Sequence, residues 1–108
     1  MTVSEAFEQL LDWHHSVAPP KKAYEVAKAL GVPRDVVPVR EFEDQRSQYK
    51  GLRLNDGEEG DKVMGVDAMQ LAMWICRHLG VEYEGTLGRG SQVKECVKSL
   101  RVHFSEEV

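Results

Sequence analysis

The residues best suited to binding chemistry are four basic side chains near the end of the chain. Lys94, Lys98 and Arg101 follow an i, i+4, i+7 spacing within GRGSQVKECVKSLR, and on a helix this spacing places them in one row. Arg89 precedes them in a turn between two glycines, where free backbone N–H groups at a helix start favour anions. We therefore expect these four residues to contact an acidic protein partner or nucleic acid. The alternative is a solvated helix face with no partner.

None of the other reactive residue types forms a recognised catalytic or metal-binding pattern. Cys76 and His78 are two residues apart and would point in different directions on a helix. Cys96 and His103 share a helix face, but that face is predicted to be buried. The stretch NDGEEGD lacks the ligands at alternate positions that a calcium-binding loop requires. We therefore predict a chain that is not an enzyme, with no catalytic residue, no metal site and no cofactor.

The stretch VAKALGVPRDVV, from Val26 to Val37, resembles a helix-turn-helix element. Ala27 is small where two helices would touch, and Gly31 lies at the position of the turn. Because such elements place their second helix in the major groove of DNA, the resemblance implies nucleic-acid binding. Pro38 departs from the pattern, since a proline within the second helix costs about 3 kcal/mol. That helix should therefore be one turn long or restart at Pro38.

The composition predicts an ordinary globular domain and limits its partners. A length of 108 residues suits one domain, and 42% of the residues are hydrophobic and 30% charged. The formal net charge of −4 gives no overall attraction to nucleic acid or to an anionic membrane, although residues 89–101 form a basic island. No apolar run could span a bilayer, the first residues are acidic where a signal peptide is basic, and two cysteines are too few for a disulfide framework. We expect residues 1–108 to form one cytoplasmic domain that does not enter a membrane.

Helix signals recur along the chain and predict an all-α fold of about five helices. Thr2 and Glu5 have the spacing of a capping box, which predicts a first helix over about residues 4–15. Pro20 suits the first turn of a second helix, because the missing N–H of proline has no hydrogen-bond role there. Gly31 should end this helix, since glycine readily takes the left-handed conformation that closes a helix.

The middle of the chain is predicted to hold a third helix followed by a loop. The helix should begin at Pro38 and end at Gly51. An acidic, glycine-rich loop at about residues 55–62 should be mobile, because it has no apolar residue to hold it in place. The stretch VEYEGTL is the only candidate strand, and it is short.

Two further helices complete the predicted fold. Asp67 can cap a helix over about residues 67–79, whose apolar residues point in nearly every direction, so this helix should be central. Trp74 should then be buried, and its truncation should leave a destabilising cavity. Gly80 has the same sequence context as Gly31 and should end the helix. The last helix should run from about Ser91 to His103 and carry the row of basic residues.

A good core, an uneven surface charge and the lack of a catalytic pattern favour a small regulatory or adaptor domain. We expect it to act by binding a macromolecular partner, most simply another protein. The alternative is a nucleic-acid-binding protein that uses the basic last helix and the partial helix-turn-helix element. The sequence leaves open the identity of the partner, the oligomeric state, and whether Trp13 is exposed or buried.

Overall fold

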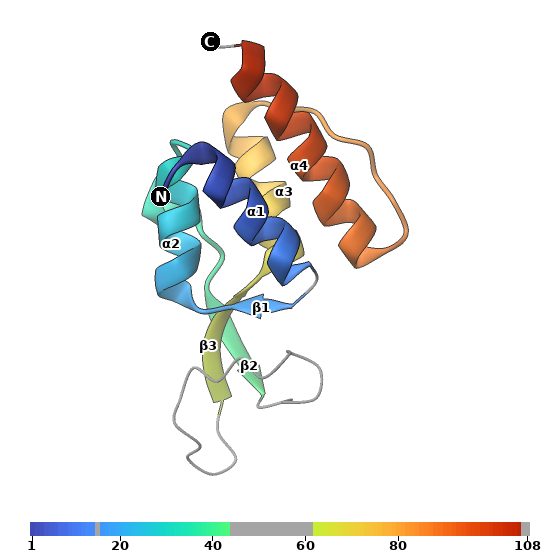
Figure 1. The fold of residues 1–108 in the computed structure, drawn as a ribbon. Helices are drawn as coiled ribbons and strands as arrows, with labels where there is room; N and C mark the ends of the chain where they lie inside the picture. Colours follow the sequence, from blue (N-terminus) through green and yellow to red (C-terminus); the bar gives the residue numbers. More distant parts are fainter. Residues whose placement is uncertain (15, 44–61, 107–108) are drawn as a thin grey trace.

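Figure 1 shows the fold in a computed structural model, which describes residues 1–14, 16–43 and 62–106. This part of the chain is mostly helical, with four α-helices, one turn of 3-10 helix and a small three-stranded sheet. The predicted all-α class is therefore right for the helices and wrong for the sheet. The elements follow in the order α1 (Val3–Trp13), β1 (Val17–Ala18), α2 (Pro20–Ala29), η1 (Arg34–Val36), β2 (Arg40–Glu43), β3 (Lys62–Asp67), α3 (Ala68–Leu79) and α4 (Arg89–Glu106).

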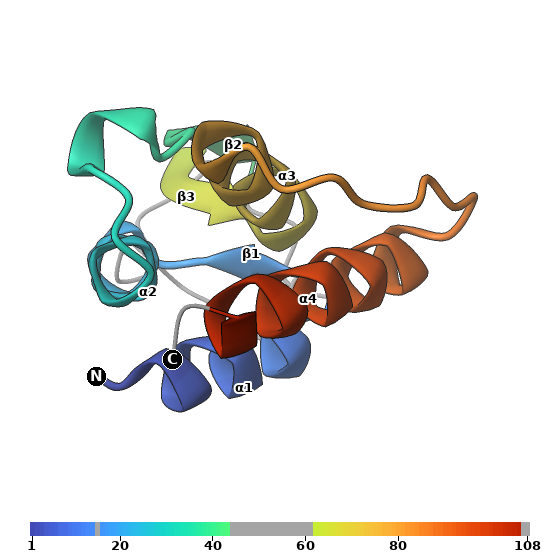
Figure 2. The same cartoon turned by 90° about the horizontal axis from the view of Figure 1, so that it is seen from above.

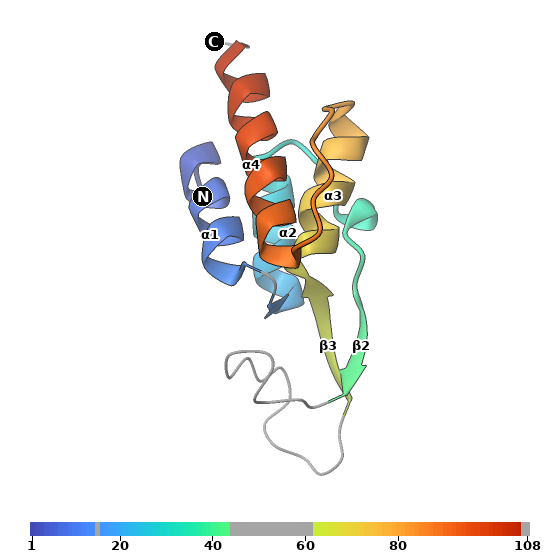
Figure 3. The ribbon, with the colours of Figure 1, turned by 90° about the vertical axis from the view of Figure 1, so that its right-hand side faces the viewer.

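The sheet is antiparallel, with the strand order β1-β3-β2. Val17 of β1 lies opposite Asp67, and Arg40 of β2 lies opposite Gly65. Figures 1 and 3 show β2 and β3 extending together away from the helices. The predicted helix from Pro38 is wrong over its first turn, because residues 40–43 pair with a strand far along the sequence, and such pairing overrides local helix preference.

Two predictions in the middle of the chain lie wholly or mostly outside the described residues. These are the remainder of the third helix, from residue 44 to Gly51, and the mobile loop at residues 55–62, of which only Lys62 is described, as the first residue of β3. The candidate strand VEYEGTL, residues 81–87, is described and is wrong. That stretch forms an irregular connection between α3 and α4 without strand pairing.

The capping and closing signals predicted for α1, α2 and α3 are present, although α1 ends two residues before the predicted end and α4 extends beyond both predicted ends. The capping box of α1 is present, because the N–H of Glu5 donates to Thr2 Oγ1 at 3.1 Å and the N–H of Thr2 donates to Glu5 Oε1 at 2.8 Å. These hydrogen bonds also lower the pKa of Glu5. Gly31 and Gly80 have φ angles of +79° and +69°, which confirms their role in closing α2 and α3.

The core lies between the four helices and β3. Figure 2 shows α4 beside α1 on one side and α3 on the other, with β1 crossing beneath. Trp13 is buried at the end of α1, so it is part of the core rather than an exposed anchor. The fully buried large side chains come from all four helices and from β1 and β3: Leu10, Val17, Val26, Leu30, Val66, Leu71, Ile75, Cys76, Val93, Cys96, Val97 and Leu100.

α3 has the predicted bounds but is not surrounded on all sides. Trp74 is 40% exposed, and the guanidinium carbon of Arg77 lies 5.4 Å from the centroid of its ring. Gln70, Trp74 and Arg77 follow an i, i+4, i+7 spacing, so the tryptophan belongs to the outward face of the helix. The expectation that Trp74 is buried in the core is wrong. The helix has apolar residues on several sides, but Gln70 and Arg77 share the face of Trp74 and mark it as the outward face.

We predict that Ile75→Ala costs much more stability than Trp74→Ala. Ile75 is completely buried, and removing a buried aliphatic side chain costs about 2–5 kcal/mol through the cavity that remains. Trp74 keeps much of its surface in water, so its truncation should cost about 1–2 kcal/mol. Urea denaturation of both variants measures the difference, and equal losses would place Trp74 in the core after all.

Candidate partner-binding surface

Three of the four predicted binding residues lie together on the outward face of α4. Lys94, Lys98 and Arg101 are all exposed, and we call these three residues the basic row. The opposite face of the helix is buried, so the row is presented by a helix that is itself part of the core. Within the part of the chain that the structure describes, no carboxylate pairs with Lys94 or Lys98.

Arg101 differs from the two lysines because its side chain also packs on an aromatic ring. Its guanidinium carbon lies 5.2 Å from the ring centroid of Phe7 in α1. Phe7 in turn contacts Phe104 of α4 edge to face, with ring centroids 5.9 Å apart. A cation above an aromatic face is attracted by the ring electrons. Arg101 therefore joins α4 to α1 while it contributes its charge to the exposed face.

Arg89 is separate from the basic row and has an acidic partner. Its guanidinium pairs with the Oδ2 atom of Asp67, the residue that caps α3. The side chain of Arg89 is 49% exposed, whereas that of Asp67 is 6% exposed. The structure therefore places Arg89 in a contact that joins the first turn of α4 to the start of α3.

The predicted glycine-containing turn before α4 is part of the helix itself. α4 begins at Arg89, two residues before the predicted start at Ser91. Gly90 is buried, and a Cβ atom there would overlap the ring of His14. His14 reaches this position from the end of α1 with a φ angle of 58°, which is unusual for a residue with a side chain. The imidazole therefore covers Gly90, where a phosphate group would have to approach the backbone.

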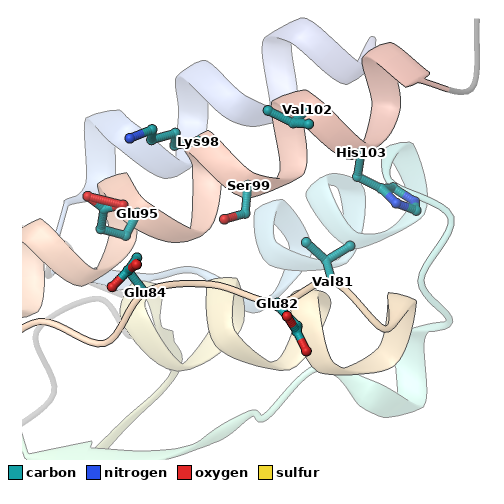
Figure 4. Close-up of a pocket in the computed structure, with 8 residues that line it drawn as sticks. All are labelled: Val81, Glu82, Glu84, Glu95, Lys98, Ser99, Val102 and His103. Carbon is teal, nitrogen blue, oxygen red and sulfur yellow. The ribbon is translucent and has the colours of Figure 1, made fainter.

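A pocket of about 360 Å³ lies beside the basic row, between α4 and the connection that follows α3. Lys98 belongs to both, because it is part of the row and lines the pocket. Figure 4 shows Glu84 and Glu95 at the same end of the pocket and His103 at the other end. The pocket is lined by Val81, Glu82, Glu84, Glu95, Lys98, Ser99, Val102 and His103.

Gln92, which was not among the residues predicted from the sequence, holds the pocket wall in place. Its side chain is buried, its Nε2 donates to the carbonyl oxygen of Glu84 at 2.8 Å, and its Oε1 accepts from the N–H of Thr86 at 3.0 Å. Both bonds reach the irregular connection. Its position in the sequence could have indicated this role. Gln92 lies one turn before Cys96 and therefore shares the apolar, buried face of the helix, where a polar side chain needs a hydrogen-bond partner.

The predicted helix-turn-helix element is only half formed. α2 and the turn at Gly31 are present, but η1 has three residues and ends at Val37. This confirms that the second helix is one turn long. The guanidinium carbon of Arg34 lies 4.2 Å from the ring centroid of Tyr24, so this cation packs back onto α2. One turn of helix is too short to lie along a DNA groove as a recognition helix does.

The two cysteines lie in the core between α3 and α4. The Sγ atom of Cys76 is 3.8 Å from the carbonyl oxygen of Cys96, and both residues are buried. Hydrogen bonding to Cys96 and burial raise the pKa of the Cys76 thiol, so it stays protonated at neutral pH. Over residues 1–14, 16–43 and 62–106, no three histidine, cysteine or acidic side chains gather as metal ligands, and no helix has the length and apolarity to cross a membrane.

We predict that Gln92→Ala loosens the connection beside the pocket. The variant loses two hydrogen bonds, and water can partly replace them, so the stability loss should be about 1–2 kcal/mol. The N–H of Thr86 should exchange with solvent much faster than in the parent protein. Ser91→Ala is the control, because Ser91 is an exposed neighbour on the same helix. Unchanged exchange at Thr86 would show that Gln92 does not hold the connection.

Comparisons with known protein families, with curated proteins and with solved structures find no match to this chain. The candidate surface consists of the basic row and the pocket beside it. The contact of Arg89 with Asp67 joins α4 to the start of α3, and the hydrogen bonds of Gln92 join the connection to α4.

Proposed function

We propose that this protein is a non-enzymatic regulatory or adaptor domain that binds an acidic segment of another protein. The binding surface is the outward face of α4, with the basic row at its centre. The observation that carries the proposal is that Lys94 and Lys98 are exposed side by side on one helix face, with no ion-pair partner among the described residues. A carboxylate-bearing segment would supply that partner.

The helix that carries the basic row is held in place by the core, which avoids the entropy cost of ordering the backbone on binding. α4 is 18 residues long and buries one complete face against α1 and α3. Its first turn is tied to the cap of α3 through Arg89, and Arg101 packs on Phe7. A partner therefore meets charges on a rigid scaffold and does not need to order a loop.

The charges beside the basic row favour a protein over nucleic acid. Glu82, Glu84 and Glu95 all line the pocket next to Lys98. A DNA duplex carries about one negative charge per 1.7 Å and would bring phosphates close to these carboxylates. A protein segment can place acidic residues over the row and avoid acidic residues elsewhere. The short η1 helix and the net charge of −4 add to this preference.

We predict that Lys94→Glu combined with Lys98→Glu weakens binding of a fluorescein-labelled polyglutamate peptide by roughly tenfold or more, because two attractions become repulsions. Fluorescence anisotropy at low and physiological ionic strength measures the affinity. Arg101 is left unchanged because its side chain packs on Phe7. Thermal unfolding should remain nearly unchanged, since surface substitutions usually alter stability by about 0.5 kcal/mol or less.

The matched control is Lys21→Glu combined with Lys22→Glu, which makes the same charge change on the exposed start of α2. This control should retain most of the affinity for polyglutamate. A peptide that does not bind at low ionic strength, or that binds both double variants equally, overturns the proposal. A mixed-sequence DNA duplex is titrated in parallel. Binding of the duplex that is tighter than that of the peptide, falls steeply with salt and is lost in the α4 variant would establish nucleic acid as the partner instead.

A further inference from the structure

We infer that the pocket beside the basic row binds one arginine side chain carried by the same acidic segment of the partner. This inference rests on the proposed function and adds the chemistry of a second contact. The partner would place carboxylates over Lys94 and Lys98 and a guanidinium group in the pocket. The juxtaposition that points to this is a pocket that combines apolar surface from Val81 and Val102 with several carboxylates and shares Lys98 with the row of exposed cations.

The pocket has the size and lining that a long cationic side chain requires. Its volume of about 360 Å³ lies within the range of small ligand pockets. Val81 from the connection and Val102 from α4 supply apolar surface, and Figure 4 shows Val81 pointing towards α4. The aliphatic stem of an arginine can lie on such surface while its charged end remains near polar groups.

The charged end of the pocket favours a guanidinium over other groups. Glu84 comes from the connection and Glu95 from α4, so two carboxylates approach the same end from different elements. Lys98 also lines this end, but with Glu82 the lining holds three carboxylates against one ammonium group, so an excess of negative charge remains for a cation. A planar guanidinium with five N–H donors can hydrogen-bond to both Glu84 and Glu95, whereas an ammonium group acts as a single point charge. An apolar side chain would remove water from the carboxylates without replacing their hydrogen bonds, and an acidic side chain would be repelled.

The walls of the pocket are held in place before any partner arrives. The backbone of Glu84 is fixed by the hydrogen bond from Gln92 to its carbonyl oxygen, at 2.8 Å. At the other end, the N–H of Val81 donates to the carbonyl oxygen of Cys76 at 2.8 Å, which fixes the start of the connection. Glu95 and Val102 lie on α4 itself. The backbone positions that carry the two carboxylates are therefore set by the fold.

The basic row and the pocket lie close enough for one segment to contact both. Lys98 belongs to both surfaces, and Glu95 is the direct neighbour of Lys94 in the chain. On a helix, consecutive residues point about 100° apart, so the row and the pocket-lining residues form adjacent stripes of α4. A segment that crosses α4 would therefore meet cations first and the acidic pocket immediately afterwards.

The test is an NMR titration of the ¹⁵N-labelled full chain with N-acetylarginine amide. The matched probe is N-acetylcitrulline amide, which has a similar shape but no charge. We expect saturable shifts of the backbone amides of Glu84, Glu95 and Ser99 with the arginine probe and negligible shifts with citrulline. Glu84→Gln combined with Glu95→Gln should abolish the response. Glu8→Gln combined with Glu25→Gln, which removes two exposed carboxylates from α1 and α2, should leave it unchanged.

A second measurement separates this inference from the proposed function. A polyglutamate peptide with one central arginine should bind the parent protein about two- to fivefold more tightly than the same peptide with citrulline at that position. The Glu84→Gln, Glu95→Gln variant should bind both peptides equally. Equal binding of both peptides by the parent protein, or arginine shifts that persist in that variant, would overturn the inference. The proposed function would still stand if Lys94→Glu with Lys98→Glu abolished peptide binding.

Discussion

The relative positions of the sheet, α3 and α4 depend on the contacts of one residue, Asp67. Its Oδ1 atom accepts hydrogen bonds from the N–H groups of Met69 and Gln70, at 2.9 and 3.4 Å, and so caps α3. Its Oδ2 atom pairs with Arg89 in the first turn of α4. Its backbone lies opposite Val17 in the sheet. A buried carboxylate needs such partners, because an unpaired charge away from water is strongly unfavourable. One residue therefore sets where the sheet, α3 and α4 meet.

α4 takes part in both the core and the outer surface, and the two roles are separated by helix geometry. Val93, Cys96, Val97 and Leu100 fill the buried side, whereas the basic row lies on the opposite side. Because the row contributes little to packing, apart from the contact of Arg101 with Phe7, its charges can change while the fold persists. A partner that binds this face, as proposed, contacts a helix packed into the core rather than an irregular segment.

Local signals predicted the helices well, and non-local contacts explain what the sequence did not reveal. Pro20, Gly31 and Gly80 act within one or two turns of their own position, so their effect can be read from neighbouring residues. The strands escaped prediction because β2 and β3 become stable only by pairing with each other across the chain. The exposure of Trp74 and the pocket beside α4 escaped for the same reason. Each depends on which distant elements pack nearby, and the pocket lies between α4 and a connection to which Gln92 hydrogen-bonds.

The basic row of α4 and the acidic residues of the pocket beside it give this surface a direction. A partner whose charges all have the same sign is attracted by either the basic row or the pocket carboxylates and repelled by the other group. Exposed charges within about 10 Å still interact at moderate ionic strength. A partner with both acidic and basic residues is attracted by both groups in only one register. In that register its acidic residues lie over Lys94 and Lys98 and its cation lies near Glu84 and Glu95. Complementary patterns of this kind contribute more to specificity and orientation than to affinity. In the function proposed above, this charge pattern selects the partner and fixes its direction along α4.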